Sequence, residues 1–69
     1  MNGFVERDRM MRWFEYAHLP AHLQLVSAQF ATLAIWMETN LARGPERTVA
    51  LRKLLEAKDA AVRSRIEAP

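Results

Sequence analysis

Two proline-marked breaks divide the chain into three segments. Pro20 follows Leu19, and because the residue before a proline disfavours the helical region, a helix is expected to begin at Pro20. At the second break, Gly44 can take the left-handed conformation that ends a helix, and Pro45 can open the next helix. The breaks therefore predict a short helix or arm followed by two long helices, over residues 1–18, 20–43 and 45–67.

Two long helices of similar length with a short connection are typical of an antiparallel hairpin. We expect an all-α fold, with residues 1–69 forming a single domain. Apolar residues recur at spacings of three and four, which predicts one buried stripe on each helix. The predicted stripes are Leu23, Val26, Phe30, Leu33 and Met37 on the first helix and Leu51, Leu55, Val62 and Ile66 on the second.

A second apolar set on the first long helix lies off this stripe and comprises Leu25, Ala28, Ile35 and Trp36. One partner helix can cover only one side, so the other side is predicted to meet another chain. The 69 residues contain no cysteine, which excludes disulfides and cysteine-bound zinc. Since one core of this size seldom supplies more than ~3–5 kcal/mol, we expect a homo-oligomer.

Several function classes find no support in the sequence. No apolar run approaches the ~18 residues of a membrane span, and the Phe4–Tyr16 segment is too charged for a signal peptide, so we expect a cytoplasmic protein. His18 and His22 are separated by a proline, which argues against a shared metal ion. Ser27 has no histidine and aspartate partner pattern for nucleophilic catalysis. We expect no enzyme activity, no cofactor and no metal.

The charge is concentrated in the last third of the chain. The net charge is +2, residues 1–18 sum to zero, and residues 19–42 hold one charge, Glu38. Residues 43–69 carry seven basic and four acidic residues. These bases are either solvated charges on a helix face or the lining of an anion pocket between chains, and arginine suits phosphate recognition. Lys58 is the best candidate for such a pocket because it falls on the apolar stripe.

The aromatic residues Trp13, Phe14 and Tyr16 lie just before the first long helix. One interpretation is that they close the open end of the hairpin. The other is that Tyr16, which we expect to be the most exposed of the three, stacks on a nucleobase near basic residues.

Three parts of the sequence together resemble a known family. The segment His18–Gln24 reads HLPAHLQ, Val26-Ser27 and Phe30 follow it, and residues 46–63 read ERTVALRKLLEAKDAAVR. These segments look like the small phage proteins of the anti-CBASS sponge type, which share a helical hairpin domain with anti-Thoeris sponges. The resemblance covers about residues 14–66, and its most specific part is the segment 46–63.

The resemblance implies non-catalytic sequestration of immune second messengers in the cytoplasm of the host cell. Such proteins form hexamers, hold cyclic dinucleotides such as 3′,3′-cyclic GMP–AMP between two protomers, and in many cases hold cyclic trinucleotides between three. Tyr16 matches the family's base-stacking tyrosine, and Arg63 is the nearest match to a basic residue of the trinucleotide pocket. The family's phosphate-binding base in the first long helix has no counterpart, because Ser27-Ala28-Gln29 occupies that stretch.

The phosphate contacts are therefore expected from the last helix of a neighbouring chain or from the N-terminal arm. The predicted ligand-binding residues are Tyr16, Arg47, Lys53, Lys58 and Arg63. The alternatives are an oligomeric helical adaptor or phage structural protein without a small ligand, and a nucleic-acid-binding protein. Four acidic residues dilute the basic last helix, so we expect neither DNA nor RNA as a partner, and no membrane.

Overall fold

The structure is a computed structural model that describes residues 9–67. It contains a 3₁₀ helix, η1 (Arg9–Phe14), and two long α-helices, α1 (Ala21–Asn40) and α2 (Pro45–Glu67), with no strand among these residues. The predicted all-α hairpin is confirmed, with helix α2 at the expected bounds. Phe4 and the rest of residues 1–8, together with residues 68–69, lie outside the described part of the chain.

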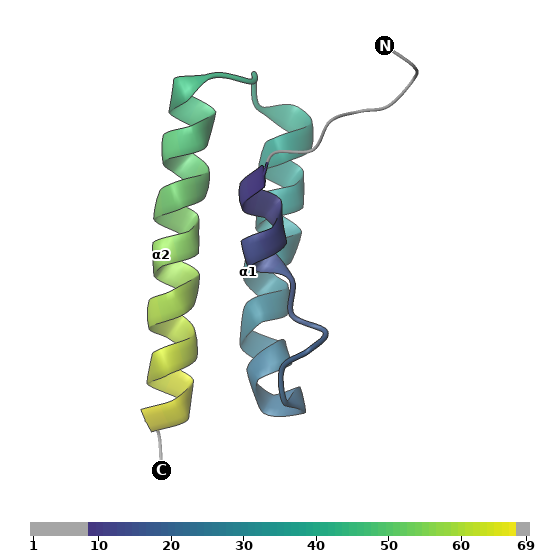
Figure 1. Ribbon diagram of the computed structural model, residues 1–69, viewed down its shortest axis with the longest axis vertical. Coiled ribbons are helices and arrows are strands. Elements are labelled where there is room, and N and C mark those ends of the chain that lie inside the picture. The colour runs from purple at the N-terminus through teal and green to yellow at the C-terminus, as the bar shows by residue number, and fades with distance from the viewer. Residues whose placement is uncertain (1–8, 68–69) are drawn as a thin grey trace.

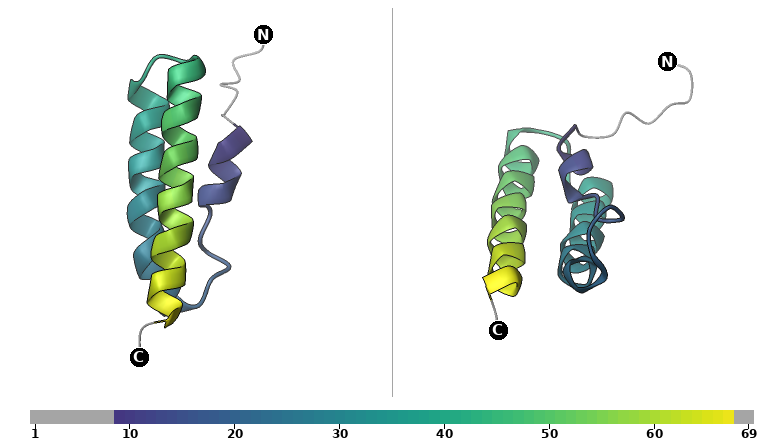
Figure 2. Two further views of the ribbon diagram at one scale, coloured as in Figure 1. Left: turned by 90° about the vertical axis from the view of Figure 1, so that its left-hand side faces the viewer. Right: turned by 60° about the horizontal axis from the view of Figure 1, so that its bottom comes forward.

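Helices α1 and α2 run antiparallel and side by side along their whole length (Figure 1). Helix η1 lies against both of them, in the half of the hairpin nearer the α1–α2 turn (Figures 1 and 2). The loop of residues 15–20 then runs along the hairpin to its open end, where α1 begins (Figure 2). The short N-terminal helix thus forms a third layer over the seam between the two long helices.

Helix α1 begins directly after Pro20, as the sequence predicts. The Pro20 carbonyl accepts hydrogen bonds from the backbone N–H groups of Leu23 at 2.9 Å and Gln24 at 3.0 Å. The Gln24 side chain reaches back, and its Nε2 donates to the carbonyls of Leu19 at 2.8 Å and Ala17 at 3.3 Å. Gln24 therefore ties the preceding loop to the first turn of the helix.

The turn between α1 and α2 differs from the prediction. Helix α1 ends at Asn40, and Leu41 is already extended while its N–H donates to the Met37 carbonyl at 2.9 Å. The left-handed cap predicted at Gly44 is wrong, because the φ of Gly44 lies outside the left-handed region. Gly44 instead precedes α2, where its carbonyl accepts the backbone N–H of Thr48 at 3.1 Å and the Thr48 hydroxyl at 3.3 Å.

The buried face of α1 consists largely of small side chains. Ala34 is fully buried and Ala31 and Ser27 nearly so, with Leu23 and Met37 at the two ends. The predicted stripe is correct at these two ends and wrong at Leu33, which is exposed. Small side chains allow helices to approach closely, so η1 and α2 both pack on this face while the larger residues lie outside. The half-buried members of the predicted stripe are Val26 and Phe30.

The buried side of α2 is centred on Leu51, which is fully buried. Leu55 and Val62 are half-buried, as expected for the predicted stripe. The prediction for Ile66 is wrong, because this residue is largely exposed. Ile66 lies in the last turn of α2, at the open end of the hairpin, whereas η1 covers the other half (Figure 1).

Helix η1 closes the core with two residues three positions apart. Met11 and Phe14 are buried between the long helices, while Trp13 is 55% exposed. Tyr16 is half-buried and packs against the same core cluster. The prediction that Tyr16 is the most exposed of the three aromatic residues is therefore wrong, because Trp13 is more exposed.

Candidate functional site

Two pockets flank η1, and we name each after one residue that lines it. The tyrosine pocket has a volume of about 550 Å³ and includes Tyr16 and Phe14. The lysine pocket has a volume of about 390 Å³ and includes Lys58 and Ser27. Both volumes lie within the range of about 300–1,000 Å³ that is usual for small-ligand sites. The two pockets share the Arg12 and Glu15 side chains as lining.

The loop after η1 positions the residues at the mouths of both pockets. The Glu15 N–H donates to the Arg12 carbonyl at 3.3 Å, and the Leu19 N–H donates to the Tyr16 carbonyl at 3.0 Å. The Gln24 side chain holds the end of this loop against α1. Tyr16 and His18 are thus placed by local hydrogen bonds rather than by long-range packing alone.

The lysine pocket is rich in charge. Its lining includes three cations, two carboxylates and one imidazole, from Arg12, Lys58, Arg63, Glu15, Asp59 and His18. With the imidazole neutral, the formal charge of this lining is one unit positive. Such a site favours an anion of low charge over a cation.

Lys58 is the most enclosed cation of this pocket. Its side chain is 14% exposed, and its Nζ lies 3.1 Å from a carboxylate oxygen of Asp59. Because Lys58 lies on the inward side of α2, much of its apolar stem is covered, and the residue lines the pocket. The predicted position of Lys58 on the apolar stripe explains this burial. Asp59 is half-exposed, so it keeps much of its hydration.

Ser27 faces Lys58's pocket from α1. Ser27 is 1% exposed, and its Oγ has no hydrogen-bond partner among residues 9–67. A serine within a helix commonly donates to the carbonyl four residues earlier, and that bond is missing here. A buried hydroxyl without a partner costs about 1–3 kcal/mol, so its presence calls for a reason.

Trp13 supplies an aromatic surface at the same pocket. The Arg12 guanidinium lies over the Trp13 ring, with its central carbon 4.9 Å from the ring centroid. Both residues line the lysine pocket. An exposed ring beside cations is the arrangement that proteins use to hold a base next to its phosphate.

The structure separates the predicted binding residues into three groups. Lys58 and Arg63 line the lysine pocket, whereas Tyr16 lines the tyrosine pocket. Lys53 and Arg47 line neither pocket. The Lys53 side chain is exposed, and its Nζ lies 3.9 Å from a Glu56 carboxylate oxygen on the next turn of α2.

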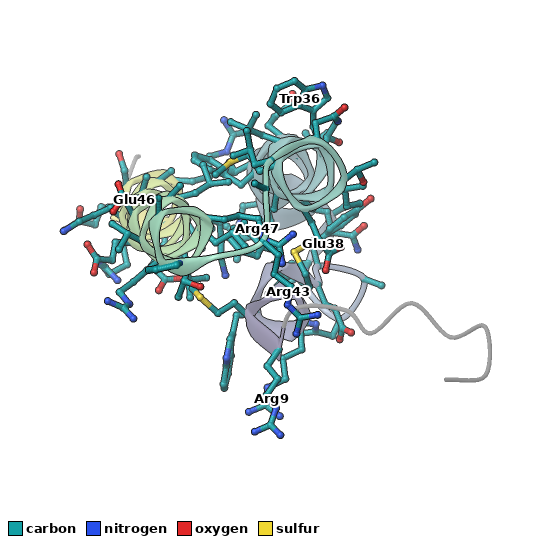
Figure 3. The ribbon with its side chains drawn as sticks, turned by 90° about the horizontal axis from the view of Figure 1, so that it is seen from above. Arg9, Trp36, Glu38, Arg43, Glu46 and Arg47 are labelled. Atoms are coloured by element: carbon teal, nitrogen blue, oxygen red, sulfur yellow. The ribbon has the colours of Figure 1, made fainter. Side chains whose placement is uncertain are left out.

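Arg47 has a structural role at the turn end of the hairpin. It is buried, and its Nη1 donates to the Glu38 main-chain carbonyl of α1 at 3.0 Å. Figure 3 shows the Arg47 side chain lying between α1 and α2. This bond joins the last turn of α1 to the first turn of α2.

Arg47→Met is expected to lower the free energy of unfolding by about 1–3 kcal/mol, because it removes a buried hydrogen bond to the Glu38 carbonyl. In a domain of this size, each kcal/mol shifts the melting temperature by about 4–8 °C. Thermal unfolding followed by circular dichroism measures the change. Arg52→Met, at an exposed position of the same helix, is the matched control and should melt like the wild type. An unchanged melting temperature for Arg47→Met would contradict the structural role.

Sequence reasoning missed two residues of the lysine pocket. The sequence shows Ser27 without a catalytic partner pattern, in the stretch where the resembled family has a phosphate-binding base, but its burial and lack of a partner are visible only in three dimensions. Trp13 was grouped with Phe14 and Tyr16, and periodicity cannot resolve which ring of a 3₁₀ helix faces outward. Its position next to Arg12 in the sequence was the one available signal.

Residues 9–67 contain neither a candidate metal cluster nor a helix that could span a membrane. No three histidine, aspartate or glutamate side chains gather there in a way that could hold a metal ion. None of the helices in this part of the chain is long and apolar enough to cross a membrane. Comparison with known proteins finds no matching family model, curated protein or solved structure.

Proposed function

We propose that this protein sequesters cyclic oligonucleotides of the kind that signal in anti-phage immunity, without cleaving them. The observation that carries the proposal is the lysine pocket, where an enclosed lysine, two arginines and an exposed tryptophan line one hollow. This combination suits a ligand that has both phosphates and bases. The resemblance to phage anti-CBASS sponges supports cyclic di- and trinucleotides as the proposed ligands and the host cytoplasm as the proposed location.

In this proposal the protein works as a homo-oligomer. The resemblance favours a hexamer. Three apolar side chains, which we call the outer stripe, are exposed on one face of α1: Leu25, Leu33 and Trp36. Trp36 points away from η1 into open space (Figure 3). Between residues 20 and 42 the only charged side chain is Glu38, so two copies can bring these stripes together without like-charge repulsion. A second copy is therefore the proposed occupant of the outer stripe.

Tight binding by so short a chain would follow from preorganisation. Stacking on an aromatic ring contributes about 1–3 kcal/mol per base, and Trp13 and Tyr16 offer one ring to each pocket. Hydrogen bonds from charged donors to phosphate are roughly twice as strong as neutral ones. Because the walls are helices that are already packed, little ordering is needed when a ligand binds.

The test is a thermal-shift panel of cyclic di- and trinucleotides, followed by recovery of the ligand after denaturation. Wild-type protein should melt at a higher temperature with at least one member of the panel, and the ligand should return chemically intact. Lys58→Met should reduce the shift, since it removes the enclosed charge and keeps the length of the side chain. Lys53→Met, which changes the other lysine of the chain at an exposed position, is the matched control.

A different outcome would favour the second candidate function, an oligomeric helical adaptor or phage structural protein without a small ligand. The outer stripe supports this candidate equally well, because it serves assembly and not ligand binding. The adaptor predicts a large particle whose melting temperature is unaffected by every cyclic nucleotide. Hydrolysed ligand would contradict both candidates and indicate an enzyme.

A further inference from the structure

We propose that Ser27 and Lys58 form a phosphate-binding subsite within a single protomer. Ser27 lies on α1 and Lys58 on α2, and both line the lysine pocket. In this subsite the Ser27 hydroxyl donates a hydrogen bond to a phosphate oxygen, and the Lys58 ammonium group supplies the opposing charge. The subsite rests on the proposed function, because it would bind the phosphates of the cyclic oligonucleotide. Inorganic phosphate alone is enough to test the subsite.

Ser27 carries an energetic cost in the free protein. Its Oγ is buried and lacks a hydrogen-bond partner among the described residues, and Ser27 is one of the residues that line the pocket. Alanine in its place would fit the neighbouring small residues Ala31 and Ala34 and would remove this cost. A polar group that destabilises the free protein, placed at a hollow lined by cations, is typical of a binding site that gains its partner from the ligand.

The ammonium group of Lys58 can change partners when a ligand binds. Its present partner, Asp59, is the next residue along α2, and adjacent residues on a helix do not face each other. Asp59 is half-exposed, so water can solvate its carboxylate when Lys58 turns toward a ligand. A phosphate can therefore replace Asp59 as the partner of the Lys58 ammonium group, and the Asp59 carboxylate is not left buried without a partner.

The remaining charges of the pocket define the anion that fits. Arg12 and Arg63 add two cations at exposed positions, Glu15 and Asp59 contribute two carboxylates, and His18 is exposed at the same pocket. The lining has one positive charge in excess when the imidazole is neutral. A phosphodiester carries a single negative charge and balances this excess, so the subsite should take one diester group of a larger ligand in preference to a polyphosphate.

The experiment uses the full chain and two probes, inorganic phosphate and 3′,3′-cyclic GMP–AMP. Ser27→Ala should leave the melting temperature of the free protein unchanged or higher, because it removes an unpaired buried hydroxyl. The same variant should bind each probe about tenfold or more weakly, as expected for the loss of a hydrogen bond to a charged group. A purely structural role for Ser27 cannot give higher stability together with weaker binding.

Ser64→Ala is the matched control, since Ser64 is exposed on α2 and is the other serine of the chain. Ser27→Cys keeps the side-chain volume close to that of serine and weakens the donor, so its affinity should lie between those of wild type and Ser27→Ala. This second variant keeps the inference testable if the alanine variant fails to fold.

The outcomes separate this inference from the proposed function. Ser27-dependent protection by phosphate, without binding of any cyclic di- or trinucleotide of the panel, would support the subsite and contradict the proposed function. Cyclic dinucleotide binding that Ser27→Ala leaves unchanged would overturn the subsite and leave the proposed function standing. A wild-type protein that binds neither probe would overturn the subsite.

Discussion

Replacing Trp36 with glutamate is expected to leave a single chain of 8.0 kDa in solution, whereas we expect a larger particle for the wild type. Trp36 is 55% exposed on α1 and belongs to the outer stripe that we propose to be covered by a second copy. A carboxylate at this position would have to be buried without a partner in the interface between copies, which costs more than the lost apolar contact alone. Light scattering at micromolar concentration measures the mass of the particle.

The matched control for this experiment is Ile66→Glu. Ile66 is at least as exposed as Trp36 but lies on the last turn of α2, away from the outer stripe. Its charged variant should assemble as the wild type does. A wild-type protein that is monomeric at the same concentration would overturn the proposed assembly. Equal dissociation of both variants would show that the interface is not confined to the outer stripe.

The second large effect is expected in the core, from Ala34→Leu. Ala34 is fully buried on the face of α1 that packs against the rest of the hairpin. Extra carbon atoms there would force the helices apart or into strained rotamers, and such overpacking costs about 1–3 kcal/mol or more. Since a core of this size seldom supplies more than about 3–5 kcal/mol, much of the protein should be unfolded. Urea titration followed by circular dichroism gives the change in the free energy of unfolding.

Ala57→Leu makes the same chemical change at an exposed position of α2 and is the control. Its stability should stay within a few tenths of a kcal/mol of the wild type, because alanine and leucine are both good helix formers. A stable, fully folded Ala34→Leu variant would show that the buried face of α1 has room for larger side chains. It would then contradict close packing as the reason that small residues occupy this face.

The helical segments could be predicted from the sequence because local signals mark their ends. Pro20 and Pro45 open the two long helices as expected, since a proline disfavours helix in the residue before it and suits the first turn after it. The end of α1 was placed three residues too late, at residue 43, because the prediction relied on Gly44 as the cap. The chain instead turns at Leu41, which has an extended backbone. No local residue pattern predicts this conformation.

The choice of buried face on α1 could not be predicted in the same way. Apolar residues occur on several sides of this helix, so spacing alone favoured the side with the larger residues, including Leu33. The structure buries Ser27, Ala31 and Ala34 because two other helices meet there, and only three-dimensional packing reveals this. The lysine pocket was missed for the same reason, since it joins residues from η1, α1 and α2 that are far apart in sequence.

The shared lining of the two pockets has a consequence for how ligands would influence each other. Arg12 and Glu15 contribute to both pockets, so the end of η1 and the residue that follows it form a common wall between them. A ligand that shifts this wall on one side alters the shape and field on the other side. By thermodynamic linkage, if the first ligand changes the affinity for the second by some factor, the second changes the affinity for the first by the same factor. Occupation of one pocket would then raise or lower the affinity of the other. The direction of this effect would depend on how the shared wall moves.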